Sequence, residues 1–215
     1  LREGGGIDGR CLGRHLDRVL PHVQGVLLAG PGMGEGRRLD PDRRKELLDK
    51  ALVIVRDAVP ILCWISRETE TGTLETLQQL RRTLERRNYR GRVYWVDTPL
   101  LYHSNRGLPF HYRQLAAAAP GPYLIHNQPA LIKDLDRPFK RTNIRTTVLK
   151  ELCLNKDLQG LIFLGSLDRA RNYQKAARSR SDFRIYDGDE AHFLNHPSLS
   201  GVVSGGANLA PRAWQ

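Results

Sequence analysis

The sequence predicts a single α/β domain with a parallel sheet. Segments typical of strands and segments typical of helices alternate along all 215 residues without a break in composition, which is the pattern of repeated strand-helix units. The clearest strand is the apolar run 158–164, which follows a polar break at 155–157 and ends before Gly165 and Ser166. Because chemistry in such folds gathers at the carboxyl ends of the strands, we expect a site near residues 162–166.

Seven segments have the length and apolar composition of strands. In chain order they are 25–29, 59–66, 92–96, 123–126, 158–164, 183–186 and 202–204. Glycine, proline or short polar residues bound most of them, as expected for buried strands that end in turns.

Helix signals lie between the strands. Asp40 and Pro41 form an N-cap followed by proline at the first helical position, and an apolar stripe from Leu47 to Val55 follows. Thr73 is expected to cap the next helix. Further helices are expected around 12–20, 110–119, 146–154 and 168–177, with a short one from residue 190.

Composition limits the classes of partner. The net charge is +11, with 34 Lys and Arg against 23 Asp and Glu, which would suit an acidic partner. The basic residues are spread along helical stretches and no nucleic-acid-binding motif accompanies them, so we read them as solvated helix faces and do not expect nucleic-acid binding.

The three cysteines, Cys11, Cys63 and Cys153, are odd in number and lack metal-ligand spacing, so neither a disulfide framework nor a zinc site is predicted. This cysteine usage fits the cytoplasm. No apolar run approaches the roughly 20 residues of a membrane span, so no membrane contact is expected.

Six groups of residues occur in the order and near the spacing of one enzyme family. They are Pro31-Gly-Met-Gly-Glu35, Thr98-Pro99 with Gly107-Leu108, His126-Asn-Gln-Pro129, Gly160-Leu-Ile162, Asp187-Gly-Asp189, and Gly201-Val-Val-Ser204 with Ala207-Asn-Leu-Ala-Pro211. Through them the chain resembles the dihydrodipicolinate synthase and N-acetylneuraminate lyase family.

The resemblance implies one (β/α)8 TIM-barrel domain over residues 1–215, related to enzymes that form a Schiff base between pyruvate and a lysine. Complete barrels typically have about 250 residues. On the family's plan the first strand would lie before Leu1 and the last helices after Gln215. The family also implies a homodimer or homotetramer, a small carboxylate or 2-oxo acid ligand, and no cofactor.

The catalytic positions of the family are largely replaced. The resemblance places Ile162 at the position of the Schiff-base lysine, and isoleucine cannot form an imine. His126 stands at the position of the relay tyrosine, and a histidine can still transfer protons near neutral pH. Leu131 stands where many members have a carboxylate-binding arginine. Lys133 could in principle supply a relocated amine.

Other ligand positions are also changed. The family's paired threonines correspond to Gly32 and Met33, although the loop through Gly34 and Glu35 could still bind a carboxylate through backbone amides. The resemblance places Leu101 at the position of a tyrosine, and Tyr102 beside it is the candidate to stand in for that tyrosine. The resemblance therefore predicts a lyase-like protein that has diverged or lost its catalysis, with His126 and Tyr102 as candidate catalytic residues and with Ile162, Leu101 and Leu131 lining the pocket.

Two alternatives remain open. Asp97, Asp187, Asp189 and His126 would surround the barrel mouth, where carboxylates and histidines can hold a metal that activates water. Against this, Asp187 and Asp189 fit a turn that caps a helix from Glu190, and Asp97 fits a turn with Thr98. No paired-histidine motif is present, so no metal is predicted. The other alternative is a small-carboxylate binding protein or subunit without catalysis.

Overall fold

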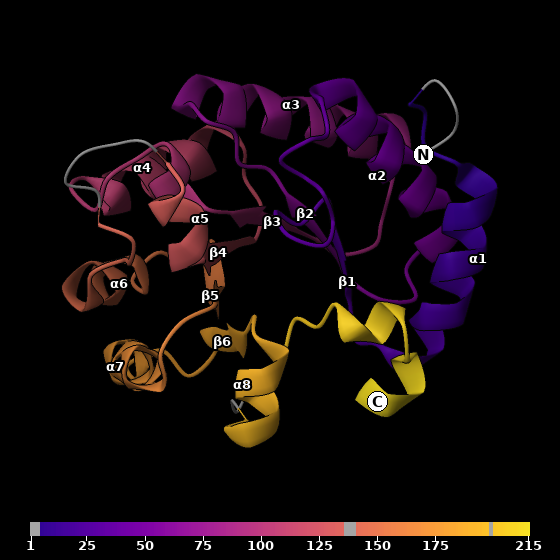
Figure 1. Cartoon of the computed structure of the whole chain (residues 1–215). Coiled ribbons are helices and arrows are strands. Elements are labelled where there is room, and N and C mark those ends of the chain that lie inside the picture. The colour runs from indigo at the N-terminus through magenta and orange to yellow at the C-terminus, as the bar shows by residue number, and fades with distance from the viewer. Residues whose placement is uncertain (1–4, 136–140, 198–199) are drawn as a thin grey trace. The chain divides into compact units, whose positions relative to one another are not determined.

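A computed structural model describes residues 5–135, 141–197 and 200–215. Its strands follow one another in chain order, β1-β2-β3-β4-β5-β6, and form one sheet (Figure 1). Their bounds are β1 Val26–Leu28, β2 Ile61–Trp64, β3 Val93–Asp97, β4 Tyr123–Asn127, β5 Leu158–Phe163 and β6 Arg184–Asp187. The neighbouring strand pairs β1-β2, β4-β5 and β5-β6 are parallel, as the alternation of strands and helices predicts.

Helices connect the strands. They are α1 Gly9–Val19, α2 Pro41–Val55, α3 Glu70–Arg86, α4 Leu108–Ala118, α5 Pro129–Lys133, α6 Thr146–Leu152, α7 Leu167–Ala177 and α8 Glu190–Asn195. Short 3-10 turns are η1 Leu20–His22, η2 Pro99–Leu101, η3 Gly206–Asn208 and η4 Pro211–Trp214. No helix within the described ranges is long and apolar enough to span a bilayer.

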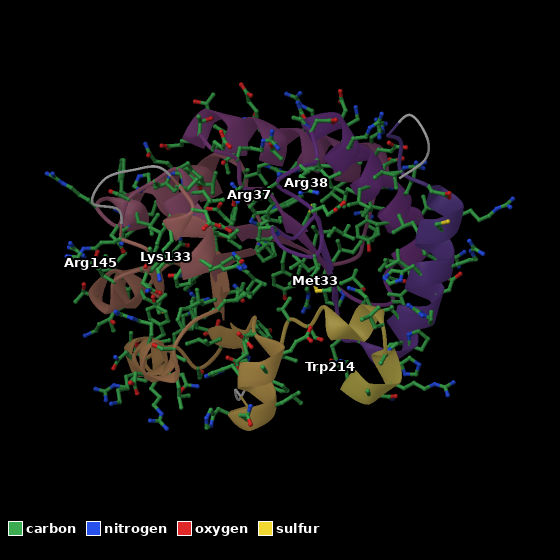
Figure 2. The ribbon with its side chains drawn as sticks, in the orientation of Figure 1. Met33, Arg37, Arg38, Lys133, Arg145 and Trp214 are labelled. Carbon is green, nitrogen blue, oxygen red and sulfur yellow. The ribbon has the colours of Figure 1, made fainter. Side chains whose placement is uncertain are left out.

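Basic side chains extend outward from these elements. Arg37, Arg38, Lys133 and Arg145, labelled in Figure 2, are all exposed. Exposure of this kind agrees with the prediction that much of the positive charge lies on solvated faces.

The described chain divides into two compact units, which we treat separately. The first draws on residues 1–65, 75–95 and 205–215, and the second on residues 66–74 and 96–204. Both units contain a buried apolar core.

In the first unit, α2 packs its predicted apolar stripe inward. Leu48, Leu52 and Val55 are buried, and β1 pairs with β2 so that Val26 lies opposite Ile61. The helix begins as expected, because the Asp40 carboxylate accepts a hydrogen bond from the Arg43 N–H at 2.8 Å.

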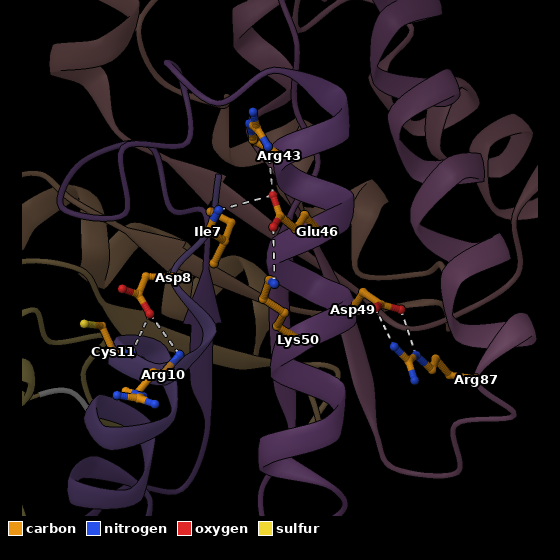
Figure 3. Close-up of polar contacts among 9 residues, drawn as sticks. All are labelled: Ile7, Asp8, Arg10, Cys11, Arg43, Glu46, Asp49, Lys50 and Arg87. Atoms are coloured by element: carbon orange, nitrogen blue, oxygen red, sulfur yellow. Dashed lines mark hydrogen bonds and ion pairs between the residues drawn. The ribbon is translucent and has the colours of Figure 1, made fainter. Parts of the chain in front are cut away.

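Polar contacts connect α2 to its neighbours (Figure 3). The Glu46 carboxylate accepts the Ile7 N–H at 3.2 Å, which holds the segment preceding α1. Asp49 accepts two hydrogen bonds from the Arg87 guanidinium, at 2.8 and 2.5 Å. These hydrogen bonds, together with one from Arg86, lower the pKa of the Asp49 carboxyl to about 2.

In the second unit, the pairing of β4 with β5 fixes two rows of side chains. His126 lies opposite Ile162, and Asn127 lies opposite Phe163. The Asn127 row faces the helices, because the Phe163 ring contacts the Tyr173 ring of α7 with centroids 5.0 Å apart. Since side chains alternate along a strand, His126 and Ile162 share the opposite face of the sheet.

The segment 202–204 and the start of α3 differ from the sequence predictions. Residues 202–204 do not form a strand, because Val202 pairs with Asp187 in an isolated bridge that does not extend into a ladder. Helix α3 begins at Glu70, so Thr73 lies inside its first turn, where its hydroxyl donates to the Thr69 carbonyl at 2.9 Å.

The remaining differences are at helix ends. Helix α4 begins at Leu108, two residues earlier than predicted, because Gly107 precedes it with a positive φ of 76°. Helix α6 ends at Leu152 rather than at residue 154. Such shifts of one or two residues are typical where helix ends are set by local hydrogen bonds.

Candidate functional site

Buried polar side chains gather where β3 and β4 end in the second unit. Asp97, the last residue of β3, is fully buried, and Thr98 and His126 are 1% and 4% exposed. Ser66, which follows β2, is also fully buried. Buried polar groups need hydrogen-bond partners, and here they find them in one another.

The Asp97 carboxylate accepts hydrogen bonds from three hydroxyl groups. Ser66 donates to Oδ1 at 2.6 Å, and Tyr102 and Tyr112 donate to Oδ2 at 2.7 and 2.8 Å. Burial raises the pKa of the Asp97 carboxyl, and the three hydroxyl hydrogen bonds offset part of that rise. Asp97 therefore lies at the centre of a buried hydrogen-bond network at the point where β3 ends and Thr98 leads into η2.

His126 is held by Thr98, whose hydroxyl oxygen lies 2.9 Å from His126 Nδ1. Burial lowers the pKa of the imidazole to about 4. The ring is therefore neutral near pH 7, with one nitrogen protonated and the other carrying a lone pair. A neutral imidazole at this position can accept or donate a proton, as a relay residue must.

Tyr102, the candidate stand-in for the family's loop tyrosine, uses its hydroxyl within the network. It donates to Asp97 and lies 3.0 Å from His111 Nε2. Burial, followed by the charge of Asp97, raises the pKa of Tyr102 well above 10. The phenol keeps its proton, so Tyr102 acts here as a fixed hydrogen-bond donor.

The pocket-lining prediction concerned three apolar residues. Ile162, Leu101 and Leu131 are 1%, 5% and 8% exposed. Gly188 is needed beside Ile162, because a Cβ on it would lie 2.1 Å from Leu164 Cδ1 and 3.4 Å from Ile162 Cγ2. Apolar side chains therefore fill the region around Ile162.

The loop with the predicted carboxylate-binding residues, Gly32 to Glu35, belongs to the first unit. Its fold depends on close backbone approach, since a Cβ on Gly36 would lie 1.7 Å from the Ala29 carbonyl oxygen. The buried Arg44 guanidinium donates to the Gly36 carbonyl at 2.6 Å and stacks over the Trp64 ring at 4.7 Å. Met33 is 72% exposed (Figure 2).

The predicted helix-capping turn after β6 is present. The Asp189 carboxylate accepts the His192 N–H at 2.9 Å and caps α8. Asp187 is 5% exposed, and its Oδ1 lies 3.1 Å from His192 Nδ1. Asp187 and Asp189 thus each have a structural role at this turn.

Sequence reasoning missed three residues near the Asp97 network. Glu70, His103 and His111 lie close together in the second unit, but they come from α3, from the loop after η2 and from α4, so no short spacing connects them. A family resemblance gives no signal for them either, because none belongs to the quoted motifs.

Comparisons with known proteins show which family the chain belongs to. The model of the dihydrodipicolinate synthetase family matches residues 2–215. A 4-hydroxy-tetrahydrodipicolinate synthase of Ectopseudomonas mendocina is 26% identical over 218 residues, covering 97% of this chain and 68% of the relative. A DapA-like lyase of Thermococcus kodakarensis is 28% identical over 217 residues, covering 98% and 69%.

Solved structures show the same fold. YagE, a prophage protein of Escherichia coli K12 from this family solved with pyruvate, has a TM-score of 0.82 at 20% identity, covering all of this chain and 69% of that one. The synthase of Methylacidiphilum fumariolicum SolV has a TM-score of 0.78 at 26% identity, covering 97% and 66%. The predicted barrel fold is confirmed over the part that this chain spans, and the chain belongs to the dihydrodipicolinate synthetase family.

Proposed function

We propose that this chain is a diverged member of its family that binds a small carboxylate or 2-oxo acid without forming a Schiff base. The observation that carries the proposal is the register of β4 and β5, in which His126 lies opposite a buried Ile162. The positions of the relay residue and of the nucleophile are adjacent, yet the second offers only an alkyl side chain.

The lysines elsewhere support this proposal. A Schiff-base lysine needs a partly desolvated pocket that lowers its pKa. Every lysine within residues 5–135, 141–197 and 200–215 is exposed or half-exposed, including Lys133 (Figure 2). In that part of the chain, none has the burial that the relocated-amine hypothesis requires.

The relatives and the neutral His126 support the proposed ligand class. YagE was solved with pyruvate, and a neutral imidazole beside the Thr98 hydroxyl can bind the keto or carboxylate oxygen of such an acid. His126 and Thr98 could support a lyase reaction that needs proton transfer alone. A reaction through an imine would need an amine, which Ile162 does not supply.

We propose that the protein is cytoplasmic and forms a homo-oligomer. The cysteines fit the first part, because all three are free thiols. Burial raises the pKa of Cys63 to about 12 and of Cys153 to about 11, which keeps both thiols protonated and unreactive. Sedimentation of the purified chain tests the oligomer, and a monomer at micromolar concentration would contradict it.

Calorimetric titration with pyruvate and longer 2-oxo acids tests binding. We expect saturable binding that His126→Ala weakens, while His196→Ala, which changes an exposed histidine, leaves it unaltered. Binding that is equally strong in both variants would place the ligand elsewhere, and no saturable binding by the folded protein would overturn the ligand proposal.

A further inference from the structure

We propose that Glu70, His103 and His111 form a binding site for one divalent transition metal ion of the zinc class. One potential ligand atom from each residue lies within 4.8 Å of the other two. Two imidazoles and one carboxylate are a donor set that zinc uses in catalytic sites, where a fourth position stays open. The inference uses none of the family's catalytic positions and does not rest on the proposed function.

His103 is already oriented as a ligand. Its Nδ1 lies 2.7 Å from the Ser104 carbonyl oxygen, which can only accept a hydrogen bond, so Nδ1 carries the proton. Nε2 is then left with a lone pair. Metal-binding histidines commonly donate their second N–H to a backbone carbonyl in this way.

His111 lies beside it, with the two rings stacked at a centroid distance of 4.9 Å. His111 Nε2 is 3.0 Å from the Tyr102 hydroxyl oxygen. Because Tyr102 donates its own proton to Asp97, its oxygen is an acceptor, and Nε2 must be the donor.

That direction determines what Nδ1 of His111 presents. His111 Nδ1 lies 3.0 Å from Glu70 Oε1. A nitrogen and a carboxylate oxygen at this distance share a cation between them. A proton or a metal ion can fill this place, and a ligand atom of His103 within 4.8 Å of the other two favours the metal ion.

The distances suit such an ion. Zinc binds nitrogen and carboxylate oxygen at about 2.0–2.2 Å, so two ligand atoms of one ion lie somewhat over 3 Å apart. The 3.0 Å between His111 Nδ1 and Glu70 Oε1 is close to that value. A series of hydrogen bonds holds the His111 ring from behind: it runs from His111 to Tyr102 and ends at the buried Asp97 carboxylate. Such a series fixes the ring of a metal-binding histidine.

The cluster is accessible from solvent. The Glu70 side chain is 57% exposed, and His103 lines an open hollow of about 920 Å³ together with four arginines and one glutamate, Arg106, Arg113, Arg141, Arg145 and Glu151. The excess of positive charge there favours an anion as the fourth ligand of the metal.

Titration of tag-free, chelator-treated protein with Zn²⁺ and Co²⁺ tests the site. We expect one ion per chain by calorimetry and visible absorption from the Co²⁺ form, both lost in His103→Gln and in Glu70→Gln. The control His15→Gln changes a half-buried histidine of the first unit and should bind as the wild type does. Circular dichroism shows which variants are folded.

Tyr102→Phe distinguishes the built site from chance chelation at the surface. It removes no metal ligand, but it removes the acceptor that orients His111, so affinity should fall about 10- to 100-fold. No binding by folded wild-type protein would mean that a proton alone lies between His111 and Glu70, and would overturn the proposal. Binding that survives both ligand variants, or that Tyr102→Phe leaves unchanged, would also overturn it.

Discussion

The buried His126 should make the protein less stable in mild acid. Its pKa is about 4 in the folded chain against 6.5 for an unperturbed histidine. Between these values the unfolded chain binds a proton that the folded chain does not, so the free energy of unfolding falls as the pH falls. Fully developed, the difference of roughly 2.5 pKa units corresponds to about 3 kcal/mol.

At pH 5 most of this loss is already present. The unfolded imidazole is almost fully protonated and the folded one is mainly neutral, and the linkage relation gives about 2 kcal/mol lost relative to neutral pH. The residue can be replaced by glutamine, which keeps a hydrogen-bonding group near Thr98 and does not titrate.

The assay is urea unfolding of the wild type and of His126→Gln, followed by circular dichroism at pH 7.5 and pH 5.0. Other titrating groups affect both proteins alike, so the wild type should lose about 2 kcal/mol more than the variant between the two pH values. Equal losses in both proteins would show that folding does not lower the pKa of His126 and would refute the reasoning from its burial.

Two further changes test the packing around the candidate sites. Asp97→Asn leaves one amide oxygen for three hydroxyl donors, and we expect the free energy of unfolding in urea to fall by about 3 kcal/mol. The control Asp168→Asn changes an exposed carboxylate and should change stability little. A loss below about 1 kcal/mol for Asp97→Asn would contradict the network. Asp49→Asn removes the carboxylate that accepts hydrogen bonds from Arg87, and because that side chain is 23% exposed, screening limits the expected loss at pH 7 to about 1 kcal/mol. Because the pKa of Asp49 is lowered, its contribution to the free energy of unfolding is present above pH 3.8 and is lost as the pH falls toward 2. The stability difference between the wild type and Asp49→Asn should therefore shrink between pH 7 and pH 3. A constant difference would argue against the ion pair.

Much of the fold could be predicted because buried parallel strands are short apolar runs with clear ends. The segments around β1 to β6 were each identified, and the Asp40 cap of α2 was placed correctly. The segment 202–204 was overpredicted because its composition resembles a strand, while strand formation depends on a neighbour that the sequence does not reveal.

The site was partly predictable for the same reason. Consecutive parallel strands are neighbours, so His126 and Ile162, from successive strands, were expected close together, and their register confirms that they pair. The partners of Asp97 could not be predicted, because Ser66, Tyr102 and Tyr112 reach it from a strand end, a loop and a helix. Tertiary packing alone brings such groups together.

The most direct test of the central claim is borohydride reduction in the presence of pyruvate, followed by intact-mass and peptide mass spectrometry. Because the resemblance assigns Ile162 to the position of the Schiff-base lysine, we expect no reduced pyruvate adduct on the folded chain under conditions that label an active member of the family. A pyruvate adduct on a defined lysine would contradict the claim, and the labelled peptide would show which amine reacts.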